Sequence, residues 1–274
     1  MTPDVEEMAA IGAAMLTANE VEQLLGKVLP EGPSAKAIQN AVRRLGEEIE
    51  TEVWSVRPLS TKGDVLAVSW DGVMTPIRET NDIAWREAGV ATVSIYGQGE
   101  EGPEKPNPRF LARMPESGMK TLLEQIVDQV VRAKDGRSCR EFAILCDDKE
   151  TIWAAASSHP ELRSAVWIPY FYHPSEKLMK AANALFGLGD CATRWHEKLR
   201  DKLLLDANAA DNMIRTMRRC RRLTAAASKE RNVVDNAIKY FRGHRDRMRY
   251  TDYIARRLPI GSGPVESAAI KSDP

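Results

Sequence analysis

The stretch Val65-Leu66-Ala67-Val68-Ser69-Trp70-Asp71-Gly72 decides the fold of this chain. Its first six residues form a short, mostly apolar run with β-branched side chains, which is typical of a buried strand. A carboxylate, Asp71, follows the run directly. Residues 58–64 have the composition of a linker, so we expect the principal domain to begin here. The sequence therefore predicts a buried strand over residues 65–70 that ends at an acidic residue.

Further elements follow this strand in a recognisable order. Apolar runs predict strands over residues 91–96, 110–114, 142–146 and 165–170. Helical spacing of apolar residues predicts helices over residues 119–133 and 149–157. The order is three strands, helix, strand, helix, strand, which is that of the ribonuclease-H-like fold. We therefore predict an α/β protein with an RNase H-like, mixed five-stranded sheet and flanking helices.

Helical segments are expected on both sides of this core. Near the start, Thr17 and Glu20 have the spacing of a capping box, and Ser34 can cap a second helix. These helices fit either a helix-turn-helix that contacts phosphates or an ordinary helical hairpin. The residues that would contact phosphates in the first case are Lys36, Arg43 and Arg44. Beyond residue 174 the composition is helical, with helices expected over 175–186, 192–205, 209–223, 230–241 and 246–257.

The charge of the chain is balanced overall but unevenly distributed. The 274 residues are 43% hydrophobic and 28% charged, with a formal net charge of zero, as in ordinary soluble proteins. Residues 194–257 hold 18 Lys and Arg against 8 Asp and Glu, whereas the first sixty residues hold 5 against 10. The basic segment predicts a polyanionic partner, with solvated helix faces as the simpler alternative.

Other signals restrict the class of protein. The four cysteines are far apart and form no CxxC pair, so we expect reduced thiols rather than a zinc site. The apolar stretch over residues 8–16 follows acidic residues and is too short to span a membrane. The phosphate-binding motif GxxxxGK[ST] is absent. We expect a cytoplasmic protein that does not use ATP.

Three carboxylates occupy matching places in the predicted topology. Asp71 follows the first strand, Asp147 follows the fourth, and Glu266 begins a late helix after Pro264. In nucleases with this topology, such carboxylates hold two divalent metal ions for phosphoryl transfer. Each position also has a simpler interpretation. Asp71-Gly72 is a strong type I′ turn signal, Asp147 can cap a helix, and Glu266 can complement a helix dipole.

Longer motifs resemble one known family, the ISKra group of bacterial insertion-sequence transposases. The resemblance covers most of the chain from about Val65 onward. The motifs that carry it are Ser69-Trp70-Asp71-Gly72-Val73-Met74, Leu111-Ala112-Arg113-Met114-Pro115-Glu116, Cys146-Asp147 with Ile152-Trp153, Phe171-Tyr172-His173-Pro174-Ser175-Glu176-Lys177-Leu178, Tyr240-Phe241-Arg242-Gly243-His244-Arg245-Asp246-Arg247-Met248-Arg249-Tyr250 and Leu258-Pro259-Ile260-Gly261-Ser262-Gly263-Pro264-Val265-Glu266-Ser267.

The resemblance implies a DNA transposase of the DDE type. Asp71, Asp147 and Glu266 would then be its catalytic ligands for Mg²⁺ or Mn²⁺, and His173 would match a histidine near the metals. The implied organisation is an N-terminal helical segment over residues 1–57 and an RNase H-like core over 58–173. A basic α-helical insertion over 174–257 and the start of the final catalytic helix over 258–274 follow.

The implied partner is double-stranded DNA, both transposon ends and target, bound by a homo-oligomer in the bacterial nucleoid. Basic residues of the insertion would contact the phosphates. The arginines expected in this role are Arg218, Arg219, Arg221, Arg222, Arg242, Arg245 and Arg249.

Three features depart from the family pattern. Tyr170 stands where the family has the Asp of an Asp-x-x-His signature, and Cys146-Asp147-Asp148 replaces Gly-Asp-Gly. The chain also ends eight residues after Glu266, so we expect a truncated or inactive remnant. Two alternatives therefore stay open beside the transposase. One is a catalytically dead DNA-binding protein, and the other is a different RNase H-like nuclease, such as a resolvase.

Overall fold

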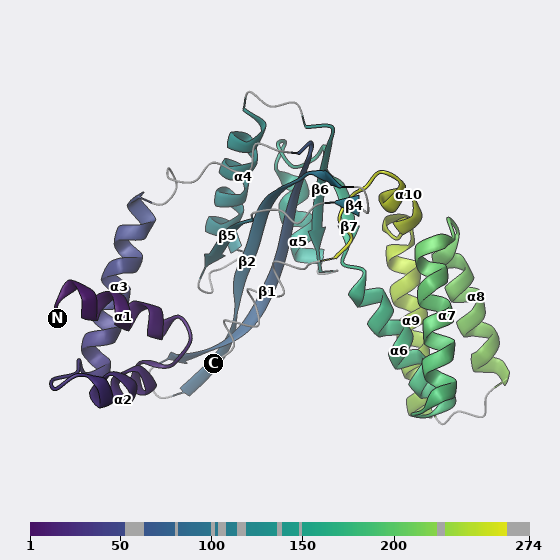
Figure 1. Cartoon of the computed structure of the whole chain (residues 1–274). Coiled ribbons are helices and arrows are strands. Elements are labelled where there is room, and N and C mark those ends of the chain that lie inside the picture. Colours follow the sequence, from purple (N-terminus) through teal and green to yellow (C-terminus); the bar gives the residue numbers. More distant parts are fainter. Residues whose placement is uncertain are drawn as a thin grey trace. The chain divides into compact units, whose positions relative to one another are not determined.

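The structure is a computed structural model in which each part of the chain is described by itself (Figure 1). The described residues are 1–52, 63–79, 82–99, 102–103, 108–113, 119–135, 139–147, 150–223 and 228–261. They fall into two compact units, one within Met1–Pro58 and the other within Leu59–Ser267.

A five-stranded mixed sheet forms the centre of the larger unit. Its strands lie in the order β5-β2-β1-β6-β7, where β1 is antiparallel to β2 and parallel to β6. The outer pairs are β2 with β5, antiparallel, and β6 with β7, parallel. The strands are β1 (Val65–Glu79), β2 (Asp82–Tyr96), β5 (Arg109–Arg113), β6 (Glu141–Cys146) and β7 (Val166–Pro169), and a small separate pair is formed by β3 (Gln98–Gly99) and β4 (Gly102–Pro103). The predicted α/β class with a mixed five-stranded sheet is confirmed.

The hairpin of β1 and β2 is longer than predicted. Asp71 does not end its strand, since it pairs with Val90 within the β1–β2 ladder, and Gly72 pairs with Gly89. The interpretation of Asp71-Gly72 as a hairpin turn is therefore wrong, and so is the strand end at residue 70. The local turn tendency is overridden because the ladder of β1 with β2 continues through both residues as far as Glu79 and Asp82. Strand β1 continues beyond Trp70, but its pairing with β6 ends there.

The two faces of the sheet pack against different helices. Val65, Ala67, Ala143, Leu145 and Ile168 belong to a core shared with the C-terminal helices. Side chains alternate between the two faces of a strand, so the intervening residues of β1 point to the opposite face. Helix α4 (Lys120–Lys134) packs against β2 and β5, and α5 (Glu150–Ser158) connects β6 to β7.

The approach of α4 to the sheet depends on Gly89. A Cβ at Gly89 would overlap with Cδ2 of Leu122, a side chain that is fully buried. We expect Gly89→Ala to lower the free energy of unfolding by about 1–3 kcal/mol, because the added methyl overpacks this contact. Urea unfolding measures the effect. Gly243→Ala is the control, since nothing lies within 4 Å of that Cβ position in helix α9 (Ser228–His244); a comparable loss there would contradict the packing explanation.

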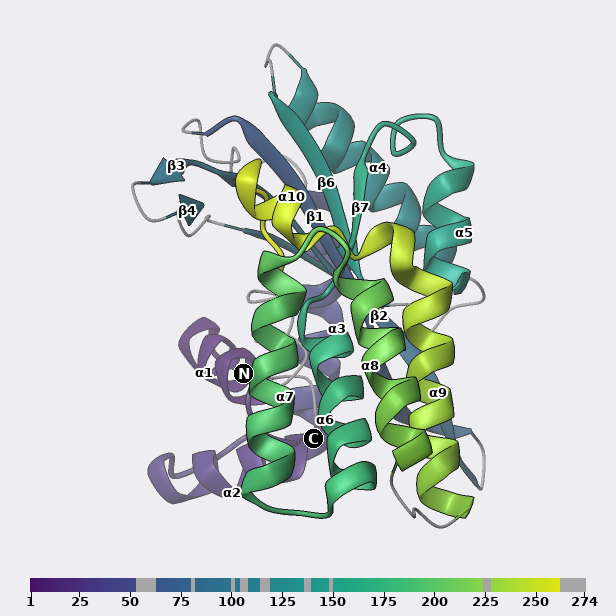
Figure 2. The same cartoon turned by 90° about the vertical axis from the view of Figure 1, so that its right-hand side faces the viewer.

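The C-terminal helices form a packed bundle. Helix α6 packs against α7 and α9, and α8 packs against α7 and α9 (Figures 1 and 2). The other helices are α6 (Tyr172–Phe186), α7 (Asp190–Leu205) and α8 (Ala209–Leu223), followed after α9 by the short helices η3 (Arg245–Arg247) and α10 (Tyr250–Ala255). The helical prediction for this region is confirmed, except that the single helix expected over residues 246–257 is interrupted between η3 and α10.

Helix α10 covers the outer edge of strand β7. The hydroxyl of Tyr250 donates a hydrogen bond to the Pro169 carbonyl at 2.9 Å, and that of Tyr253 reaches the Trp167 carbonyl at 3.3 Å. Arg256 then makes a bidentate ion pair with Glu141 at the start of β6, at 3.0 and 2.6 Å. The interruption before α10 thus lets two tyrosines turn towards the sheet.

A buried tyrosine on β2 makes the fold sensitive to alkali. Burial raises the pKa of Tyr96 to about 12. The pKa of Tyr96 is higher in the folded state than in the unfolded state, so the neutral phenol contributes to the free energy of unfolding. This contribution is complete below pH 10 and is lost as the pH rises towards 12. Between pH 8 and pH 11, we expect the free energy of unfolding to fall by about 1.3 kcal/mol more in the parent protein than in Tyr96→Phe, measured by urea unfolding. An equal pH dependence in both proteins would contradict the prediction.

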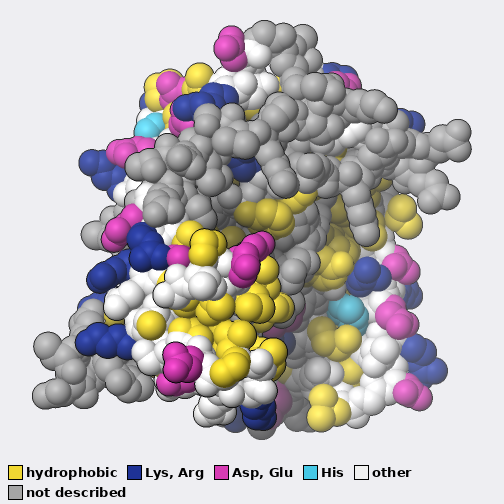
Figure 3. Space-filling view, turned by 60° about the vertical axis from the view of Figure 1, so that its left-hand side comes forward, with side chains coloured by type: hydrophobic (Ala, Val, Ile, Leu, Met, Phe, Trp, Pro, Cys, Tyr) yellow, Lys and Arg dark blue, Asp and Glu magenta, His cyan; other side chains and the backbone are white. Residues whose placement is uncertain are grey.

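The smaller unit contains three helices, α1 (Pro3–Ala13), α2 (Ala18–Val28) and α3 (Ala35–Glu52). The predicted capping box of Thr17 and Glu20 is confirmed, and Ser34 accepts a hydrogen bond from the Ala37 amide. Arg44 forms an ion pair with Glu6, and α3 packs against both α1 and α2. Hydrophobic side chains also gather on the surface of this unit (Figure 3); the exposed ones are Met1, Met8, Ile11, Met15, Leu16, Leu24, Val28 and Val42.

Candidate active site

The candidate site lies where three neighbouring parallel strands stop pairing with one another. Trp70 of β1 pairs with Cys146 of β6, and Cys146 pairs with Pro169 of β7. The next residue along each strand is Asp71, Asp147 or Tyr170. Adjacent strands lie about 4.8 Å apart, so the register places these three residues side by side. All three are on the sheet face that packs against the C-terminal helices, since Tyr170 belongs to that core.

The side chains of this row contact one another and the helix that follows. Nε2 of His173, in the first turn of α6, lies 3.6 Å from Oδ1 of Asp147. The rings of Tyr170 and His173 have centroids 5.8 Å apart. Asp71 accepts a hydrogen bond from the Gly72 amide at 2.7 Å, and its charge acts on the Tyr170 hydroxyl. Asp71, Asp147, Tyr170 and His173 thus form one cluster.

Tyr170 is the buried centre of this cluster. Its hydroxyl donates to the Trp70 carbonyl at 3.2 Å, which ties the end of β7 to β1 across β6. Burial raises the pKa of Tyr170 well above its ordinary value, and the nearby charge of Asp71 raises it further. The phenol is therefore neutral at physiological pH and acts as a hydrogen-bond donor.

Asp147 and His173 are the more accessible members. The side chain of Asp147 is 18% exposed and that of His173 is 31% exposed, so both can reach a ligand from solvent. The start of α6 holds His173 in place, because Pro174 and Ser175 beside it are buried.

The chain returns to this site shortly before Glu266. The Ile260 carbonyl accepts a hydrogen bond from the Phe171 amide at 2.9 Å, and Leu258 and Pro259 are buried. Glu266 itself, like the helix predicted to begin there, lies outside the described residues.

The donor set suits a hard divalent cation. Asp71 and Asp147 supply carboxylate oxygens on adjacent strands, and Mg²⁺ or Mn²⁺ prefers oxygen ligands. Within the described ranges, no group of three or more His, Cys, Asp or Glu side chains is arranged to hold a metal. Asp71 and Asp147 are the two described carboxylates that could hold such an ion together.

The seven arginines predicted to contact DNA lie on α8, α9 and η3 and, in the case of Arg249, directly before α10. Arg221 pairs with Asp235 at 2.7 Å, as the solvated-face alternative expects. Ion pairs also join Arg245 to Asp246 at 3.5 Å and Arg249 to Asp252 at 4.0 Å. The other four are exposed and have no ion-pair partner among the described residues; they are Arg218, Arg219, Arg222 and Arg242.

Helix α8 presents a basic face that includes one arginine missed from the sequence. Arg215, Arg218, Arg219 and Arg222 are all exposed and have the spacing i, i+3, i+4 and i+7, which places them on one side of a helix. The buried residues Met213, Ile214 and Met217 occupy the other side. Arg215 could have been found by this spacing, whereas Tyr170 was noticed only as a departure from a motif.

Comparison with known proteins adds no assignment. No family model matches the chain, and no curated protein matches it. None of the helices in the described part of the chain has the length and apolar character needed to cross a membrane.

Proposed function

We propose that this protein is a metal-dependent enzyme that cuts and joins DNA strands, a transposase of the DDE type with an RNase H-like core. The observation that carries the proposal is the position of Asp71 and Asp147. Each follows a paired residue, Trp70 and Cys146, at the end of the same parallel ladder. Carboxylates so placed can share metal ions that lie about 4 Å apart.

The topology supports the same proposal. The strand order β5-β2-β1-β6-β7, with two antiparallel and two parallel pairings, is the order expected for an RNase H-like sheet. Helices α6 to α9 follow β7 and precede Glu266, as an α-helical insertion before a final catalytic helix would.

Each residue of the site has a distinct proposed role. Asp71 and Asp147 would hold Mg²⁺ or Mn²⁺, with Glu266 as a further ligand. Bound metal would supply an activated oxygen nucleophile and stabilise the leaving oxygen during phosphoryl transfer. His173 lies beside Asp147 and could donate a hydrogen bond to a phosphate oxygen. Tyr170 positions the ends of β1 and β7 through its bond to Trp70.

Duplex DNA is the proposed substrate, at transposon ends and at the target, with a homo-oligomer as the working form. The exposed arginines of α8 support this choice, because a row of cations on one helix face can follow a row of phosphates.

A second candidate function is DNA binding without catalysis. Tyr170 favours it, because a phenol kept neutral by burial stands where the resembling family has a carboxylate. The two functions differ in the effect of a divalent metal, because the enzyme would cleave DNA when metal is added and the DNA-binding protein would not.

The test is incubation of end-labelled duplex DNA with the protein in Mg²⁺, in Mn²⁺ and in EDTA. Cleavage that requires either metal, followed by joining of the new 3′ ends to a second duplex, supports the transposase. Cleavage without joining indicates another nuclease of the same fold. Binding in every buffer with no cleavage in any would replace the enzyme with the DNA-binding function.

A further inference from the structure

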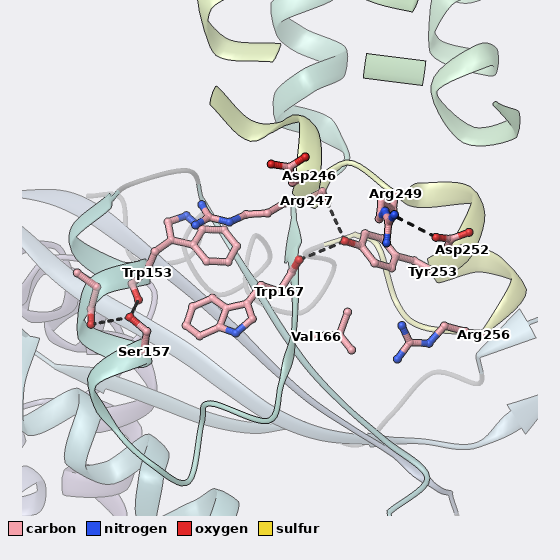
Figure 4. A pocket seen from close by; sticks show the side chains of 11 residues that line it. Trp153, Ser157, Val166, Trp167, Asp246, Arg247, Arg249, Asp252, Tyr253 and Arg256 are labelled. Atoms are coloured by element: carbon pink, nitrogen blue, oxygen red, sulfur yellow. Dashed lines mark hydrogen bonds and ion pairs between the residues drawn. The ribbon is translucent and has the colours of Figure 1, made fainter. Parts of the chain in front are cut away.

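A pocket lies on the outer side of β7, and none of Asp71, Asp147 and Tyr170 lines it. It is a cavity of about 730 Å³ between α5, β7 and the segment from η3 to α10 (Figure 4). This volume falls within the range of about 300–1,000 Å³ that is usual for small-molecule sites. Among the residues that line it are Trp153, Ser157, Trp167, Arg247 and Tyr253.

Two tryptophans form the aromatic wall of this cavity. The rings of Trp153 and Trp167 have centroids 4.9 Å apart and are tilted by 36°. Trp153 is only 5% exposed, whereas Trp167 on β7 is half-buried and keeps part of its surface accessible. A flat, apolar ligand can therefore pack against Trp167.

Arg247 is the cation of this cavity that has no acidic partner among the described residues. Its guanidinium lies 4.4 Å from the Trp153 ring centroid, and no carboxylate in the described ranges pairs with it. The other charges near the cavity are matched. Asp252 pairs with Arg249, Asp246 with Arg245, and Glu141 with Arg256.

The backbone of Arg247 is also fixed. Tyr253 donates from its hydroxyl to the Arg247 carbonyl at 2.9 Å, and the same oxygen lies 3.3 Å from the Trp167 carbonyl (Figure 4). The guanidinium thus starts from an ordered segment, which lowers the entropic cost of binding an anion. Ser157 donates to the Trp153 carbonyl at 2.8 Å and keeps lone pairs that can accept a hydrogen bond from a ligand.

We propose that this cavity binds a nucleoside phosphate, with the phosphate on Arg247 and the base against Trp167. A guanidinium matches the geometry of phosphate oxygens, and an indole ring stacks on any nucleobase. The ligand could be a free nucleotide or an unpaired nucleotide of a nucleic acid strand. The site is separate from the carboxylates and does not require the proposed catalytic activity.

Isothermal titration in EDTA tests the proposal with four probes: dAMP, deoxyadenosine, inorganic phosphate and a short oligo-dT. We expect dAMP to bind at least tenfold more tightly than deoxyadenosine or phosphate alone, because base and phosphate contribute together. Equal binding of phosphate and dAMP would overturn the proposal. Oligo-dT binding tenfold more tightly than dAMP would identify a strand as the source, and weaker binding would identify free nucleotide.

Matched variants assign the binding to this cavity. Arg247→Gln should weaken dAMP binding about tenfold, because it removes a charge-assisted contact. Arg245→Gln makes the same change in the same short helix but outside the cavity lining, and should change binding less than twofold. Trp167→Leu should also weaken binding, whereas Trp167→Phe should largely retain it. Equal effects of the Arg247 and Arg245 variants would show general electrostatics instead. Asp71→Asn should bind dAMP as tightly as the parent protein does. The nucleotide site would then be independent of the proposed catalytic site.

Discussion

Metal-dependent DNA cleavage is expected to fall about a thousandfold or more in Asp71→Asn and in Asp147→Asn, equivalent to about 4 kcal/mol of transition-state stabilisation. The reason is that each substitution removes a charged metal ligand while keeping the shape of the side chain. An asparagine at position 71 can still accept the hydrogen bond that Asp71 takes from the Gly72 amide. The fold should therefore be preserved, with a melting temperature close to that of the parent protein.

The control for this pair is Asp128→Asn on helix α4. Asp128 is 45% exposed and pairs with Arg132 at 2.8 Å, on a helix that packs against β2 and β5. Its cleavage rate should stay within twofold of the parent rate, measured in Mg²⁺ and again in Mn²⁺. If Asp71→Asn retains more than a tenth of the parent rate while Mg²⁺ is still required, the metal is held elsewhere.

Reversing charge on helix α8 should produce the second large effect. We expect the double variant Arg218→Glu and Arg222→Glu to weaken duplex DNA binding by about 10- to 100-fold at low salt. Both arginines are exposed, four residues apart on the same helix face. The slope of log affinity against log salt should also become shallower, by about 0.9 for each phosphate that the variant no longer neutralises.

A double variant on α4 separates local binding from net charge. Lys120→Glu with Arg132→Glu changes the net charge of the protein by the same amount on a helix that packs against β2 and β5. Its DNA affinity should fall less than threefold. Equal losses in the two double variants would support general electrostatic attraction and would count against α8 as the DNA-binding face.

The strands of the core could be predicted because their apolar runs are short and bounded by turn residues. It was harder to predict which strands pair with each other, because pairing joins residues that are far apart in sequence. The Asp71-Gly72 pair illustrates this limit. Its local tendency indicates a turn, yet Val90 and Gly89 lie opposite it in the completed hairpin. The pairing of β1 with β2 decides between a turn and a continued strand at this position.

The residues of the candidate site that follow strand ends could be predicted from the sequence. The contacts of the site that depend on side-chain packing could not. Asp147 and His173 were expected near each other, and they lie 3.6 Å apart. The hydrogen bond from Tyr170 to the Trp70 carbonyl was not foreseen, because it joins residues 100 positions apart. The cavity around Arg247 was missed for the same reason: its three parts meet only after α10 has folded back on β7.

The tyrosines of α10 determine which side of the sheet can accept another strand. Along β7, the Pro169 carbonyl accepts from the Tyr250 hydroxyl, and the Tyr253 hydroxyl lies 3.3 Å from the Trp167 carbonyl. Pro169 itself has no amide hydrogen to offer. An incoming strand would find few of the regular backbone groups that it needs there. Helix α10 therefore protects the β7 edge against strand addition, whether from a partner or from a misfolded copy.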